Sequence, residues 1–377
     1  MKERIDILVP DEVLAENEAK KQRLEKAHRF EPVDRVPVVV DAQLWGLLHA
    51  RRAGFTELTE SPRHHLRGQI LNRKWRIENI RDDRPIEAGC LVIETDFGAL
   101  RGIEFPLEIV WNGDEPPKVL HLLKEPEQID RLRIPDPQGG LNARRINWYR
   151  AMTEMAGDFD VRLNGEPLEI RVDLTHPGGP FPSAFALCGS NIFLWMKTDP
   201  ERVHRLMDIT TRSHLQVIAC FAEITGRDRD HSVWLGADAA EMVRPPMFRE
   251  FIAPYYLRIW EQHPAPRVYH MCGKIDHLLE ILRDEMQITY LDGFGFPVDR
   301  RRLADQLSGR VVLRGGPHPV LIHDGPREAI IAECSDYIRT AGSKGGYILS
   351  EGNGLMAGTP PEHVEAMVEA SMRAGAG

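Results

Sequence analysis

The feature of this sequence that most constrains its fold is a regular alternation of short apolar runs with longer amphipathic segments from residue 144 onward. Short apolar strands separated by helices are typical of βαβ units, and therefore of a parallel sheet that is buried on both faces. The pattern predicts strands over residues 168–174, 232–237, 267–272, 287–291, 310–314 and 346–350. It predicts helices over residues 144–156, 190–196, 200–224, 246–263, 274–284, 300–306, 325–341 and 361–374.

The remaining strands are predicted in the first part of the chain. Residues 36–40 form a β-branched apolar run that ends at Asp41, and a further strand is predicted near residue 92. The total of about eight strands favours a closed (β/α)8 barrel of the TIM type, which is an α/β fold. We therefore expect an N-terminal helical extension over residues 1–35 and a single barrel domain over residues 36–377. Within that domain, residues 88–141 are predicted to form a small antiparallel excursion, with strands at Cys90–Ile93 and Glu108–Trp111.

Composition excludes several classes of protein. The net charge of −9 argues against a nucleic-acid partner, because phosphate binding needs a basic surface. The five cysteines are odd in number and scattered, unlike the disulfide framework of a small secreted domain. No stretch approaches the roughly 18 apolar residues of a membrane span. The charged N-terminal segment also lacks the apolar region of a signal peptide. We therefore expect a cytoplasmic protein with no membrane contact.

Side chains that can act as ligands, acids or bases gather where the predicted strands end. In a (β/α)8 barrel this is the edge at which the chemistry takes place. A chain without a site would place turn residues there, but fewer of this polar type. The residues concerned are Asp41, Asp173, His176, Asp238, His270, Cys272, Asp292, Arg314, Glu351 and Asn353.

The most informative pair is His270 and Cys272, in the sequence VYHMCG that ends one predicted strand. Side chains two residues apart on a strand point to the same face, so this imidazole and this thiol are expected to lie side by side. Together they make half of a tetrahedral zinc site. The alternative is a buried cysteine acting as a small apolar residue beside a histidine bonded to a backbone carbonyl.

Further metal ligands have to come from other strands. Asp238 ends the preceding predicted strand, and Glu351 ends the last one. Either carboxylate is a candidate zinc ligand, or a partner that orients His270. The alternative for both is helix capping, because each residue lies shortly before a predicted helix.

Candidate residues for catalysis and substrate binding follow from the same pattern. His176 lies in a loop rich in glycine and proline and is a candidate catalytic residue, the alternative being an exposed loop histidine. Arg314 precedes Gly315–Gly316, where backbone N–H groups and a guanidinium would suit an anion. Trp45 and Phe294 are candidate apolar walls for a substrate. Packing in the core is the alternative for these two aromatic side chains.

Four segments of the sequence carry a resemblance to a known family. They are Glu31–Val38 (EPVDRVPV), Thr198–Val203 (TDPERV), Pro254–Tyr255, and the closing stretch with Gly352–Gly354 (GNG) and Thr359–Val364 (TPPEHV). Taken together, over nearly the whole chain, they resemble the uroporphyrinogen decarboxylase-like superfamily. The resemblance implies a (β/α)8 barrel and an enzymatic function.

This superfamily contains two chemistries. Its decarboxylases carry an arginine-rich RQAGR segment near the first strand that grips the carboxylates of a porphyrinogen, whereas Asp41–Gly46 (DAQLWG) has no arginine. A polyanionic substrate is hard to hold without such a clamp. His270–Gly273 (HMCG), by contrast, resembles the zinc motif of methyltransferases that work with corrinoid proteins. One branch has a third cysteine ligand where this chain has Asn353, which we place among the substrate-binding residues. The resemblance then implies an oxygen donor, from Asp238 or Glu351, as the next zinc ligand.

The resemblance therefore implies a zinc- and corrinoid-dependent methyltransferase. Zinc would polarise the heteroatom of a small methylated donor, for example a methoxyaromatic in an O-demethylation. The methyl group would pass to or from a corrinoid that a partner protein carries. A homodimer is compatible with this expectation. Two alternatives stay open, namely a metal-free decarboxylase of the uroporphyrinogen type, in which Asp41 or Asp292 stabilises a protonated intermediate, and a non-catalytic barrel.

Overall fold

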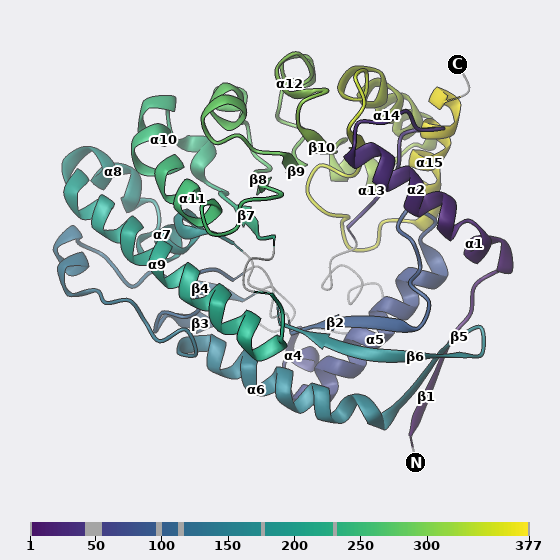
Figure 1. Ribbon diagram of the computed structural model, residues 1–377, viewed down its shortest axis with the longest axis horizontal. Helices are drawn as coiled ribbons and strands as arrows, with labels where there is room; N and C mark the ends of the chain where they lie inside the picture. Colours follow the sequence, from purple (N-terminus) through teal and green to yellow (C-terminus); the bar gives the residue numbers. More distant parts are fainter. Residues whose placement is uncertain are drawn as a thin grey trace. The chain divides into compact units, whose positions relative to one another are not determined.

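The structure, a computed structural model, describes residues 2–41, 55–95, 100–111, 117–174, 178–228 and 232–375. It confirms the α/β class (Figure 1). The chain divides into two compact units, each described by itself below. The first unit comprises Met1–Glu94, Arg150–Asp173 and Leu291–Gly377, and the second comprises Thr95–Tyr149 and Leu174–Tyr290.

The first unit contains two groups of hydrogen-bonded strands. In one group the order is β1 (Glu3–Ile7), β5 (Phe159–Leu163), β6 (Glu166–Asp173) and β2 (Cys90–Glu94). Strand β1 is parallel to β5, β5 is antiparallel to β6, and β6 is parallel to β2. The other group has the order β9 (Tyr290–Phe294), β10 (Val312–Gly315) and β11 (Tyr347–Leu349), and β10 and β11 are parallel.

Val38, in the first strand predicted for the barrel, forms a parallel bridge to Leu349 of β11. The first and last predicted strands are therefore neighbours, as a barrel requires. The hydrogen-bonded strands of the described ranges do not close into a ring of eight, however. Closure of the barrel accordingly stays a prediction.

The helices of the first unit begin at identifiable caps. Ser61 accepts a hydrogen bond from the backbone N–H of His64, and Asp299 accepts bonds from those of Arg301 and Arg302, as N-cap residues do. Helix α14 packs against α15. The helices are α1 (Asp11–Ala15), α2 (Asn17–His28), α4 (Phe55–Leu58), α5 (Pro62–Asn79), α12 (Arg300–Leu307), α13 (Pro319–Asp324), α14 (Arg327–Ala341), α15 (Pro361–Gly375) and the 3-10 turn η2 (Ala156–Asp158).

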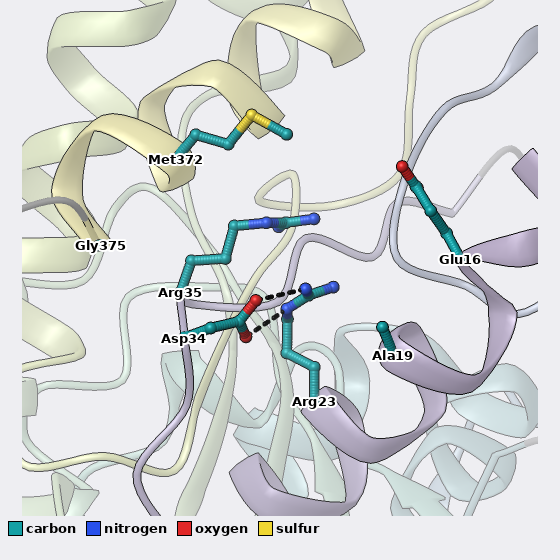
Figure 2. Close-up of a pocket in the computed structure, with 7 residues that line it drawn as sticks. All are labelled: Glu16, Ala19, Arg23, Asp34, Arg35, Met372 and Gly375. Carbon is teal, nitrogen blue, oxygen red and sulfur yellow. Dashed lines mark hydrogen bonds and ion pairs between the residues drawn. The ribbon is translucent and has the colours of Figure 1, made fainter. Parts of the chain in front are cut away.

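Asp34 and Arg35, in the N-terminal motif Glu31–Val38, belong to a network of ion pairs. Asp83 is fully buried and accepts hydrogen bonds from Arg23 and Arg35, each at 2.7 Å, and from the backbone N–H of Val38. Arg23 also binds Asp34 and, mainly through that hydrogen bond, lowers the pKa of Asp34 to about 2. Figure 2 shows Arg23, Asp34 and Arg35 among the residues that line a pocket of about 400 Å³. The network ties α2 to the first predicted strand.

In the second unit, the motif Thr198–Val203 runs from the last residue of α8 into the first turn of helix α9. Asp199 caps it by accepting from the backbone N–H of Arg202, and Pro200 occupies the first turn, where its missing N–H is not needed. The core of this unit includes Ile146, Leu174, Val217 and Phe221. Its helices are α6 (Gly140–Met155), α7 (Pro180–Cys188), α8 (Asn191–Thr198), α9 (Pro200–Thr225), α10 (Pro245–Phe251) and α11 (Ala253–Trp260), with short turns η1 (Pro126–Arg131), η3 (Ala240–Met242) and the π-helical η4 (Ile281–Glu285).

Three predictions about single elements were wrong. The N-terminal segment is not purely helical, because it starts with β1, whose apolar residues Ile5 and Ile7 are buried. The excursion at 88–141 is not one antiparallel pair, since β2 pairs in parallel with β6 while β3 (Glu108–Val110) pairs antiparallel with β4 (Lys118–Leu120). The helix predicted over residues 274–284 forms only in its second half, where helical residues 279–280 lead into the π-helical turn η4.

Among the described residues, no helix is both long and apolar enough to cross a membrane.

Candidate metal centre

Two short parallel strands of the second unit position the metal candidates. Strand β7 (Trp234–Gly236) pairs with β8 (Val268–His270) so that Gly236 lies opposite His270 (Figure 1). The pairing continues for one more bond, because the backbone N–H of Ala237 donates to the His270 carbonyl at 3.0 Å. The segments that follow β7 and β8 leave the sheet side by side, and this brings Asp238 close to His270 and Cys272.

The three side chains form a compact group of metal-ligand type. One ligand atom from each residue lies within 4.8 Å of the other two. Asp238 Oδ1 lies 3.5 Å from His270 Nε2 and 3.7 Å from Cys272 Sγ. Zinc bonds of the usual lengths in tetrahedral geometry would separate such atoms by about 3.3 to 3.8 Å. Nitrogen, sulfur and oxygen donors at this spacing fit a zinc ion with three protein ligands and one open position.

Burial and a neighbouring carboxylate keep the Cys272 side chain protonated. Burial raises the pKa of the thiol to about 12, and the neighbouring Asp238 carboxylate adds to this effect. The cysteine is therefore a neutral thiol until a cation replaces its proton. The His270 ring packs at 5.0 Å, centroid to centroid, from that of Trp234. Asp238 is 45% exposed, so one side of the group is open.

Glu351, the fourth predicted ligand, makes its described contacts in the first unit. It is 3% exposed and accepts hydrogen bonds from the backbone N–H groups of Asp41 and Gly354 and from the Ser350 hydroxyl. Burial, and then the Asp41 carboxylate, raise the pKa of Glu351 to about 8. Within the second unit, the structure groups Asp238 with His270 and Cys272, while the role of Glu351 as a ligand remains a prediction.

A second polar cluster lies entirely in the first unit. Arg314, 12% exposed, binds Asp41 at 2.6 Å and Asp292 at 2.9 Å. Asp41 is also bound by Arg84 at 2.7 Å. Burial opposes ionisation of Asp41, but the two guanidinium groups outweigh it and lower the pKa of this carboxyl. The predicted catalytic residues Asp41 and Asp292 are thus brought together, with Arg314 between them.

Of the four other predicted residues, the structure describes Phe294 and Asn353. Phe294 is 1% exposed and packs near Tyr337 and Tyr347, which fits the core alternative. Asn353 is exposed. Trp45 and His176 lie outside the described residues. The roles assigned to these four side chains remain predictions.

Sequence reasoning missed one residue beside each of these two groups. Glu241, three residues after Asp238, accepts a hydrogen bond from the backbone N–H of Lys274. Arg84 lies between two acidic residues and a proline after a helix, and its approach to Asp41 is long-range. Neither residue lies at the end of a predicted strand. No local spacing pattern marks them.

Comparisons with known proteins agree with this architecture. The sequence model of the family described as Uroporphyrinogen decarboxylase (URO-D) matches residues 19–373. A curated relative named uroporphyrinogen decarboxylase, from Anaeromyxobacter dehalogenans (strain 2CP-C), is 29% identical over 360 residues, or 91% of this chain and 96% of the relative. Another of the same name, from Xanthomonas axonopodis pv. citri (strain 306), is 24% identical over 375 residues, with 93% and 98% covered.

Among solved structures, the chain is similar to a methyltransferase from Methanosarcina mazei. The TM-score is 0.65 at 19% sequence identity, and the match covers 94% of this chain and 98% of the other. At this level of identity the likeness shows a shared fold.

Proposed function

The chain belongs to the uroporphyrinogen decarboxylase family, and we propose that within it this protein is a zinc-dependent methyltransferase. It would move a methyl group between a small methylated substrate, such as a methoxyaromatic, and a corrinoid carried by a partner protein. The family's (β/α)8 barrel, closed by all eight strands, is part of the proposal. The observation that carries the proposal is the convergence of His270, Cys272 and Asp238.

In this proposal the three side chains would hold the metal, and the substrate would bind to it beside them. A zinc ion bound there would supply Lewis-acid chemistry, making the substrate heteroatom a better leaving group. His270 contributes a nitrogen donor whose ring is held against Trp234. Cys272 contributes sulfur once its proton has been displaced. Asp238 bridges the two through a single carboxylate oxygen.

The first unit supports this choice over decarboxylation of a polyanionic substrate. Such a substrate needs arginines that are available to its carboxylates. Arg314 is instead bound to Asp41 and Asp292, and Arg84 is bound to Asp41. The segment Asp41–Gly46, where the decarboxylases carry their arginines, has none.

A metal-free decarboxylase is the second candidate. The names of the curated relatives favour it, and so does the pairing of Asp41 with Asp292 across Arg314. In that case the two aspartates, and not the metal group, would contact the substrate.

Elemental analysis of the purified protein, followed by methyl transfer from a panel of methoxyaromatics to reduced cobalamin, tests the proposal. We expect about one zinc per chain. Both the zinc and the methyl transfer should be lost in His270→Ala and Cys272→Ser. A protein that binds no zinc and decarboxylates a porphyrinogen would establish the second candidate instead. Absence of zinc and of both activities would leave a non-catalytic barrel.

A further inference from the structure

We propose that Glu241 is a positioning residue for the candidate metal centre. It holds the chain just after Cys272, keeps the thiol beside Asp238, and thereby increases the affinity for a divalent cation. The assignment rests on the metal centre of the proposed function, but it concerns a residue that is not itself in the ligand group.

The contact that carries this assignment joins the two loops that bear the ligands. Glu241 lies in η3, three residues after Asp238, and its Oε2 accepts a hydrogen bond from the backbone N–H of Lys274, two residues after Cys272. Strand β8 ends at His270, so regular strand pairing does not reach Cys272. The position of the thiol therefore depends on contacts of the segment that follows it.

Gly273 shows how closely the carboxylate approaches this segment. A Cβ atom added to Gly273 would lie 1.9 Å from Glu241 Oε2 and 2.1 Å from its Cδ, far inside van der Waals contact. The glycine thus leaves the space that the carboxylate occupies, directly beside the main chain of a metal-ligand candidate. An alanine there would displace Glu241 or shift the backbone.

The hydrogen bond of Glu241 is one of three that join the segment after β7 to the segment that bears His270 and Cys272. At the first ligand of strand β8, the Ala237 N–H donates to the His270 carbonyl at 3.0 Å. After both ligands, a hydrogen bond of 3.0 Å joins the His277 ring Nε2 and the Val243 carbonyl. The Glu241 contact lies between these two in sequence. It is therefore placed to set the spacing of Cys272 from Asp238.

The negative charge of Glu241, like its hydrogen bond to the Lys274 backbone, should increase the affinity for a divalent cation. Glu241 is half-buried, and its carboxylate interacts electrostatically with Cys272. A negative charge beside the ligand group attracts a divalent cation, and residues that orient metal ligands typically change affinity 10- to 100-fold when removed. Glu241→Ala should remove both contributions. Glu241→Gln should remove the charge but keep an oxygen that accepts the Lys274 N–H.

The experiment is a competitive chelator titration with Zn²⁺ alone, repeated with Co²⁺ while the thiolate-to-cobalt charge-transfer band is recorded. We expect Glu241→Ala to raise the Kd for zinc about 10- to 100-fold and to weaken that band. Glu241→Gln should raise the Kd by less. Glu261→Ala, which removes an exposed carboxylate of the same unit, serves as the matched control and should bind like the wild type.

Thermal unfolding of each metal-free variant checks that the fold is kept. If Glu241→Ala does not fold, Gly273→Ala tests the same contact from the other side and should also raise the Kd. Wild-type affinity and an unchanged cobalt spectrum in a folded variant would overturn the assignment alone. Failure of the wild-type protein to bind either metal would overturn both the assignment and the proposed function.

Discussion

At the scale of single residues, this protein places its ionisable side chains in two different kinds of surroundings. The metal candidates share one partly open group, in which Asp238 is 45% exposed. Arg314 and Asp292 are 12% and 15% exposed and are paired with each other. Glu104 of the second unit is 1% exposed and accepts a hydrogen bond from Ser213. These differences in exposure lead to different expectations for each residue.

Removal of Arg314 should destabilise the protein strongly. Arg314→Ala leaves the Asp292 carboxylate and the Asp41 carboxylate without their shared cation, and uncompensated charge in a buried setting typically costs 3–5 kcal/mol. We expect a loss of about 3 kcal/mol in the free energy of unfolding, at the low end because Asp41 is 44% exposed. Urea denaturation measures it. The control Arg4→Ala removes an exposed pair with Asp6 and should leave the free energy of unfolding nearly unchanged. Equal losses would contradict this reading.

Glu104 should make stability depend on pH. Burial raises the pKa of Glu104 above its ordinary value of 4.5. The folded state therefore keeps the proton to higher pH than the unfolded state does. The resulting stabilisation is complete below about pH 4.5 and is lost as the pH rises through the folded-state pKa. As the pH rises through that pKa, the free energy of unfolding should fall less in Glu104→Gln than in the wild type.

Urea denaturation at a series of pH values compares the two proteins, with Glu261→Gln as an exposed control. The same pH dependence in the wild type and in Glu104→Gln would rule out Glu104 as its source.

At the scale of elements, the N-terminal strand is part of the first unit and not an appendage. Strand β1 pairs in parallel with β5, which lies more than 150 residues later in the chain. Buried and half-buried residues alternate regularly in β5, but this strand follows directly on a helix and a 3-10 turn. A pattern this short is read as a strand only when its partner is known. This is why both strands escaped the sequence analysis.

The pairing of β1 leads to a prediction about stability. Ile7 is fully buried, and truncation of a buried isoleucine to alanine usually costs 2–5 kcal/mol. We expect Ile7→Ala to lower the free energy of unfolding by about 3 kcal/mol. The neighbouring Leu8→Ala, at a residue 66% exposed, should change it by less than about 0.5 kcal/mol. Urea denaturation of both variants is the test. If the segment were a detachable extension, neither substitution would change the free energy of unfolding.

At the scale of the whole molecule, the fold should not depend on the metal. The candidate ligands lie in loops or at the very end of a strand, and a chain of 377 residues buries a large apolar core without them. Dialysis against a strong chelator should therefore abolish methyl transfer but leave the far-ultraviolet circular dichroism unchanged. Zinc should raise the Tm in a concentration-dependent manner, because it binds only the folded state. Unfolding upon chelation would contradict this expectation.

Local patterns in the sequence determined the α/β class, most helices and strands after residue 144, and the pair His270 and Cys272. The reason is that each of these depends on periodicity over a few neighbouring residues. Helix α9, for example, begins with the Asp199 cap and Pro200 that the motif contains.

Only the tertiary structure decided which side chains from distant segments meet. The register of β7 on β8 places Asp238 beside His270 and Cys272. The same pairing places Glu241 where it accepts a hydrogen bond from the backbone N–H of Lys274. Asp41 met Arg314 because strands far apart in the chain lie side by side. Such contacts are set by long-range packing, which leaves no periodic signal in the sequence.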